Sequence, residues 1–170
     1  MRIEDNLLNI PQEEYSGDYK THCLEQYKLY IEMTDRISSR RLSANSFFLT
    51  VNTLLIGFVG YVHLGAEKAT HFYFLISLAG LILCYTWYRL IRSYDEMNFA
   101  KFIIIHAIEK HLPFTIYHAE WEALGRGKDP QKYLPFTKIE KRIPWIFFSL
   151  HLFTFLFSLP QKKLWIVFTQ

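Results

Sequence analysis

The chain has 170 residues, a net charge of +3 and a hydrophobic fraction of 51%. A chain of this length builds one domain and excludes a second independent core. The aromatic fraction is high at 18%, and the apolar residues are concentrated in blocks that charged segments separate. Because the Lys and Arg residues cluster beside these blocks, where they set membrane orientation, we expect a protein of the lipid bilayer with no nucleic-acid partner.

The first 43 residues predict a tail followed by a helix. Residues 1–19 are acidic and lack apolar periodicity, which indicates a flexible acidic N-terminal tail. They contain no apolar segment typical of a cleavable signal peptide, so the N-terminus is expected in the cytoplasm. Residues 20–43 have apolar positions at steps of three and four and contain no Gly or Pro. This pattern is typical of an amphipathic cytoplasmic helix that continues into the following apolar block.

Three apolar blocks predict membrane-crossing helices. The first, residues 44–64, has no charged residue and is long enough to cross about 30 Å of hydrocarbon. The second, residues 71–91, carries only Arg89, whose long side chain reaches the interface from the end of the helix. The third, residues 143–160, begins beside Pro144 and is at the short end of spanning lengths. We therefore predict an all-α, polytopic helical membrane protein with about three transmembrane helices.

Residues 92–142 carry charges of both signs and predict a small helical cytoplasmic domain. One helix is expected to end before Pro113, and a second, through the sequence AEWEAL, to end at Gly125. Residues 161–170 are expected to form a C-terminal tail. Basic residues at the inner ends of the spans predict that the N-terminus and this domain lie on the cytoplasmic side of a bacterial inner membrane. The residues that set this orientation are Arg36, Arg40, Arg41, Arg89, Lys141 and Arg142.

Small and polar residues recur along the first span at steps of three and four, which places most of them on one stripe of the helix. Three alternatives explain such a stripe in a membrane: packing within one subunit, contact between subunits, or the lining of an aqueous path. The stripe comprises Ser46, Thr50, Asn52, Thr53, Gly57 and Gly60. Smaller sets are expected to pack helix against helix: Ser77, Gly80 and Cys84 in the second span and His151, Thr154 and Ser158 in the third.

The sequence contains no motif for the common catalytic chemistries. It has no phosphate-binding glycine loop, nucleophile elbow or paired-cysteine zinc site. One group of acid–base side chains is worth weighing, although its spacing is not that of a zinc-binding helix. This group is His106, His111, His118, Glu120 and Glu122. We expect no catalytic residue, no metal, no cofactor and no enzymatic activity, with a membrane-bound hydrolase using the His106–Glu122 region as an alternative.

Several segments together resemble a known bacterial family. The segment YKLYIEMTDRISSRRLSANSFFLTVNTLLIGFVG is followed by NFAKF, LPF, AEWEALGRGK and PFTKIEKRIPWIFF. In order and spacing over residues 20–150, these segments resemble the RipA family of octameric small integral membrane proteins. The resemblance implies a homo-oligomeric ring, an octamer by the description of the family.

The same resemblance implies a role in anti-phage defence. By resemblance, the chain is a pore-forming effector of abortive infection that oligomerises and permeabilises the inner membrane when a phage is sensed. A phage-encoded oligomeric protein, such as a portal, is the implied trigger. A membrane-anchored accessory or regulatory subunit of a separate effector is the rival interpretation, beside the hydrolase. Because one chain of 20.3 kDa cannot enclose a wide pore, the stripe would lie between subunits or around a central opening.

Overall fold

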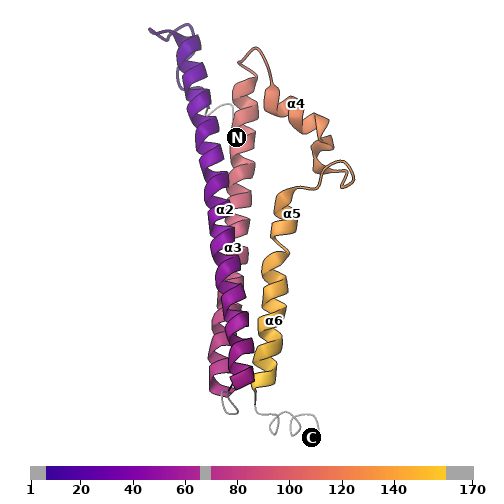
Figure 1. Cartoon of the computed structure of the whole chain (residues 1–170). Coiled ribbons are helices and arrows are strands. Elements are labelled where there is room, and N and C mark those ends of the chain that lie inside the picture. The colour runs from indigo at the N-terminus through magenta and orange to yellow at the C-terminus, as the bar shows by residue number, and fades with distance from the viewer. Residues whose placement is uncertain (1–6, 66–69, 160–170) are drawn as a thin grey trace, which may run out of the picture. The chain divides into compact units, whose positions relative to one another are not determined.

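The computed structural model describes residues 7–65 and 70–159, which contain helices and turns but no strand (Figure 1). The prediction of an all-α membrane protein is confirmed. The helical elements are α2 (Tyr19–Gly65), α3 (Thr70–Glu109), α4 (Ile116–Ala123), the 3-10 turn η1 (Gly125–Gly127), α5 (Phe136–Glu140) and α6 (Ile143–Ser158). The predicted tail at residues 161–170 lies outside the described residues, as do the first six residues of the predicted N-terminal tail.

The two long helices each join segments that the sequence predicts separately. Helix α2 contains both the amphipathic helix and the first span, and α3 continues from the second span to Glu109. Between Gly80 and Pro113 the sequence has neither Gly nor Pro, so nothing interrupts the backbone hydrogen bonds of α3 where the span ends. The predicted boundary at residue 92 is therefore a change of side-chain polarity within one helix.

Two helices in the described part of the chain are long and apolar enough to cross a membrane. They lie at Tyr19–Val62 and Phe72–Glu109, and only 11% and 28% of their most apolar windows are buried. A core helix of a soluble protein buries most of its apolar residues. Here large side chains such as Leu54, Tyr61 and Phe72 are more than 60% exposed. This exposure fits helices that are solvated by lipid.

The chain divides into two compact units, and α2 and α3 each contribute to both. Unit 1 comprises residues 1–41 and 93–136, and unit 2 comprises residues 42–92 and 137–170. The predicted polar domain, residues 92–142, therefore extends a few residues beyond unit 1. Each unit has its own interior, so the prediction that a chain of this length has a single core is wrong.

Unit 2 is a bundle of the apolar parts of α2 and α3 with α6. Its core contains Phe48, Trp87 and Ile91, which are at most 8% exposed. The rings of Phe48 and Trp87 are stacked with centroids 5.8 Å apart. The ring of Phe147 on α6 also contacts the ring of Trp87, with centroids 6.2 Å apart. Helix α6 has 16 residues, or about 24 Å of axial rise, and carries no Asp, Glu, Lys or Arg. It is shorter than the two long helices, and a third span remains a prediction.

Unit 1 is held by side chains from α2, the end of α3 and α4. Ile105 and Glu109 are fully buried, and the ammonium of Lys101 lies 4.3 Å from the centroid of the Tyr30 ring. An ammonium over an aromatic face is attracted by the electron density of the ring, so this contact holds α3 against α2. The interior of unit 1 is therefore partly polar, in contrast to the aromatic core of unit 2.

Candidate functional site

The small-residue stripe of α2 lies on the surface of unit 2, with one exception. Thr53 and Gly57 are exposed, and so are Ser46, Thr50 and Gly60. A methyl group added at Gly57 or Gly60 would meet no atom within 4 Å. The hydroxyl of Thr53 donates to the carbonyl of Leu49 at 2.8 Å, so this polar group is satisfied by its own helix. Among the three explanations of the stripe, packing within one subunit does not account for these five residues.

Asn52 is the exception, because its side chain lies in the interior of unit 2. It is 0% exposed, and its amide nitrogen donates to the carbonyl of Phe48 at 2.8 Å. Its oxygen Oδ1 accepts the thiol of Cys84 at 3.1 Å and lies 3.1 Å from Nε2 of His151. One amide thereby links α2 to α3 and α6. At 100° per residue, Asn52 and Thr53 cannot share a helix face, which explains why the stripe separates here.

Gly80 provides the space for the imidazole in this polar cluster. A Cβ atom at Gly80 would lie 2.3 Å from Nδ1 and 2.5 Å from Cγ of His151, far inside van der Waals contact. His151 is 1% exposed, so its ring has no room to move aside. Gly80, Cys84 and the buried Ser77 face the bundle interior, as the sequence predicts for a packing set, and Ser77 donates to the carbonyl of Tyr73 at 2.6 Å.

The orientation residues lie at one end of unit 2 and on the adjoining residues of α2. Arg89 donates from Nη1 to the hydroxyl of Tyr85 at 3.3 Å, and Arg36 pairs with Glu32 at 2.7 Å. Exposed side chains are found at Arg40 and Arg142, and half-buried ones at Arg41 and Lys141. This mixed exposure is compatible with a role in setting the membrane topology. Contacts within one chain do not test that role, so the orientation stays a prediction.

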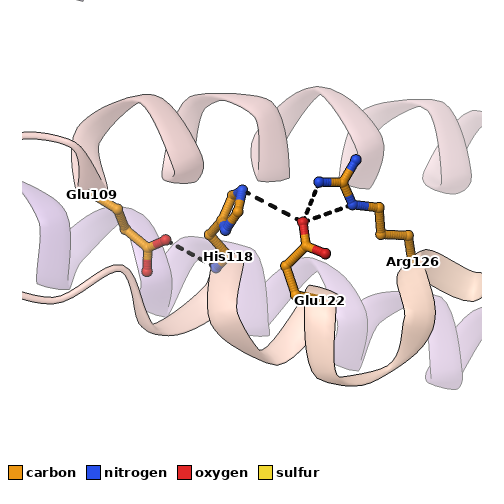
Figure 2. A network of polar contacts seen from close by, with 4 residues as sticks. All are labelled: Glu109, His118, Glu122 and Arg126. Atoms are coloured by element: carbon orange, nitrogen blue, oxygen red, sulfur yellow. Dashed lines mark hydrogen bonds and ion pairs between the residues drawn. The ribbon is translucent and has the colours of Figure 1, made fainter.

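Unit 1 contains a buried carboxylate, Glu109, that the sequence does not single out. Glu109 accepts the backbone N–H groups of Tyr117 at 2.7 Å and His118 at 3.1 Å, and the Tyr27 hydroxyl at 3.2 Å. It therefore caps the first turn of α4, where backbone N–H groups have no partner within the helix. Figure 2 shows that the chain of contacts continues from His118 to Glu122 and Arg126.

The group proposed for a hydrolase is not gathered into one site. The rings of His106 and His118 are in contact with centroids 5.5 Å apart, whereas His111 and Glu120 are exposed. The carboxylate of Glu122 accepts a hydrogen bond from Nε of Arg126 at 2.7 Å. Hydrogen bonding to Arg126 is the main reason why the pKa of the Glu122 carboxyl is lowered. Within residues 7–65 and 70–159, no three His, Cys, Asp or Glu side chains are placed to hold a metal ion. The arrangement resembles a helix cap with an exposed ion pair.

A family comparison decides the class of protein. The model of the octameric membrane protein family matches residues 24–160. The chain belongs to this family. Neither a curated protein sequence nor a solved structure gives a significant match. The chain is accordingly a membrane protein that assembles into homo-oligomers, and the resemblance drawn from the sequence is confirmed at this level.

Membership of the octameric membrane protein family gives the exposed stripe a context. In a bilayer, small residues let helix backbones approach closely, and the hydroxyl groups of Ser and Thr form hydrogen bonds across helices. The residues with which α2 packs inside its own chain, such as Phe48 and Asn52, lie on a different face from Ser46 and Thr53. The stripe is therefore available to a neighbouring copy of the chain.

Tyr27 offers a test of the buried cap through pH. Burial, and then the negative charge of Glu109, raise the pKa of Tyr27 to about 12 from an ordinary value of 10.0. A group with a raised pKa contributes stability that is complete below its unfolded pKa and is lost as the pH rises through the folded one. We expect the wild-type melting temperature in detergent to fall between pH 10 and 12, and Tyr27→Phe to show a smaller fall.

At neutral pH, Tyr27→Phe should cost about 1–2 kcal/mol, because a hydrogen bond to a charged group is lost. Circular dichroism during heating measures both effects. Tyr19→Phe is the control, since Tyr19 contacts the ring of Tyr15 edge-on at 5.8 Å, and its pH profile should match that of the wild type. Equal profiles for Tyr27→Phe and Tyr19→Phe would contradict the assignment.

Proposed function

We propose that the protein is a pore-forming effector of anti-phage defence, which oligomerises and permeabilises the bacterial inner membrane when a phage is sensed. Two findings support the proposal: membership of the octameric membrane protein family and the resemblance of residues 20–150 to the RipA family. The proposal includes the orientation predicted from the basic residues, with unit 1 on the cytoplasmic side. It also includes a phage-encoded oligomeric protein as the trigger.

The observation that supports an opening between subunits is the contrast between the interior and the surface of unit 2. The interior is filled by large side chains, including Phe48 and Trp87, and by the hydrogen bonds of Asn52. The polar and small residues of the stripe, such as Thr50 and Thr53, lie outside. A filled bundle has no path for ions, so a conducting path would form where identical chains meet around an axis.

A trigger changes the state of such an assembly only through differential binding. If the resting and open rings differ in free energy by a few kcal/mol, the trigger must bind the open ring correspondingly more tightly. An oligomeric phage protein offers many identical contacts at once, and linked contacts multiply their effect through a high local concentration. This reasoning favours a ring-shaped trigger over a monomeric one.

The proposal assigns no catalysis to the chain. The fully buried carboxylate near the acid–base group, Glu109, accepts hydrogen bonds from backbone N–H groups and a tyrosine hydroxyl of its own unit. A carboxylate occupied in this way supports a structural role. The observation supports the pore interpretation over the hydrolase and leaves the accessory-subunit interpretation to experiment.

The decisive experiment is dye release from liposomes that contain the purified full-length protein and no other protein. We expect release of a small encapsulated dye that rises when an activating phage protein is added. In cells, the same effector should admit a membrane-impermeant DNA stain after infection. Intact liposomes together with stained cells would identify the protein as an accessory subunit of a separate pore. Intact liposomes together with unstained but protected cells would exclude both a pore and an accessory subunit of one.

A further inference from the structure

Among the described residues of unit 2, the Lys, Arg, Asp and Glu side chains are confined to one end. Its described residues, 42–65, 70–92 and 137–159, contain five Lys or Arg side chains and a single carboxylate. The carboxylate is Glu140, and the cations are Arg89, Arg92, Lys138, Lys141 and Arg142. The rest of these segments contains no Asp, Glu, Lys or Arg. The result is a positive girdle at the end of the bundle where α3 leaves unit 2 and α6 begins.

Contacts between aromatic rings place the two halves of this girdle at the same level. The rings of Tyr88 on α3 and Trp145 on α6 meet edge-on with centroids 5.3 Å apart. Arg92 lies one helical turn beyond Tyr88, and Arg142 lies just before the first turn of α6 that contains Trp145. Arg89 is next to Tyr88 in sequence. The three arginines therefore lie within about one helical turn, along their own helices, of one aromatic contact.

The girdle is exposed and its aromatic neighbours are typical of a membrane interface. Arg89, Arg92 and Arg142 are all exposed, and Trp145 is 50% exposed. Trp and Tyr side chains favour the depth of the lipid headgroups, where the ring is in an apolar layer and its polar atom is hydrated. Since unit 2 belongs to a membrane protein, we expect the exposed guanidinium groups at the depth of the lipid phosphates.

We propose that this end of unit 2 binds the headgroup of an anionic phospholipid, with Arg89, Arg92 and Arg142 contacting the phosphate. Arginine suits this role because its planar fork of donors matches phosphate oxygens bidentately. The beginning of α6 adds the positive end of a helix dipole to the same region. Basic residues between helices at a membrane surface are a general form of anionic-lipid recognition.

The test measures which lipids the purified full-length oligomer retains. Protein is equilibrated with mixed micelles of phosphatidylglycerol and phosphatidylcholine in equal amounts, and bound lipids are counted by native mass spectrometry. We expect the wild type to be enriched in phosphatidylglycerol. The variant Arg89→Gln, Arg92→Gln, Arg142→Gln should lose this preference by about fivefold for each cation removed.

The control removes three exposed cations of unit 1 instead, with the changes Lys20→Gln, Lys128→Gln and Lys132→Gln. It should retain the wild-type preference. Enrichment that persists in the arginine variant would overturn the proposal, and so would displacement of the lipid by inorganic phosphate at constant ionic strength. If the arginine variant does not fold, the wild-type protein alone still tests the proposal. Wild-type protein that retains the two lipids in the same equal ratio as the micelles would exclude a site for the anionic headgroup.

Discussion

Replacing Gly80 with alanine is expected to destabilise unit 2 by about 3 kcal/mol, the sum of an overpacking cost and a lost hydrogen bond. The added methyl carbon would lie 2.3 Å from Nδ1 of His151, and the ring is 1% exposed and cannot turn aside. Moving the ring breaks its 3.1 Å contact with Oδ1 of Asn52. Oδ1 of Asn52 would then keep only the thiol of Cys84, a weak donor, and a buried amide that loses a strong partner is destabilising. Thermal unfolding in detergent, followed by circular dichroism, measures the change.

The matched control for Gly80→Ala is the same change in a protein that lacks the imidazole. His151→Ala alone is expected to be destabilising, because it leaves a cavity and removes a partner of Asn52. Adding Gly80→Ala to His151→Ala should cost much less than adding it to the wild type, since the methyl group then occupies vacated space. Equal destabilisation in the two backgrounds would show that the methyl group added at position 80 and the imidazole of His151 do not compete for the same volume.

The ends of the helices of this protein can be predicted from the positions of Gly and Pro in the sequence. Residues 18–56 contain no Gly or Pro, which predicts that the amphipathic helix and the first span join into one α2. The same rule explains why α3 passes the end of its span without a break. Gly125 terminates α4 in the left-handed region, at φ 64°, as its place after AEWEAL predicts. Polarity, which sets the depth of a segment in the membrane, does not set where a helix ends.

Side-chain roles were harder to predict, because they depend on partners that are distant in sequence. Asn52 was grouped with the stripe, but its partners are 32 residues away at Cys84 and 99 residues away at His151. The position of Asn52 on the helix is a usable signal: it lies five residues from Gly57, not three or four, so it does not share the face of Gly57. Glu109 gave no such signal, because its role depends on the turn that brings Tyr117 back to it.

Gly57→Leu is expected to weaken the oligomer while leaving the protein inserted in the membrane. A Cβ atom at Gly57 would meet no atom within 4 Å beyond its own stretch of helix, and the position is exposed, so we expect the folding of unit 2 to be unchanged. At a close helix–helix contact between subunits, four added carbons hold the backbones apart and cost about 1–3 kcal/mol per interface. A closed ring repeats this cost at every interface. Thr53→Leu, on the same exposed stripe, should act in the same direction.

Native mass spectrometry and light scattering of the detergent-solubilised protein measure subunit number, and a protease-accessible tag reports insertion. Phe58→Leu is the matched control: it places the same side chain at the next position of α2, where phenylalanine is 50% exposed and about 100° away from the stripe. The control should keep the wild-type subunit number, because leucine and phenylalanine are equally suited to lipid contact. A full-size ring in Gly57→Leu, with unchanged dye release, would mean that the stripe faces lipid, and the subunit contact would then have to be sought on another face of α2 or on α6.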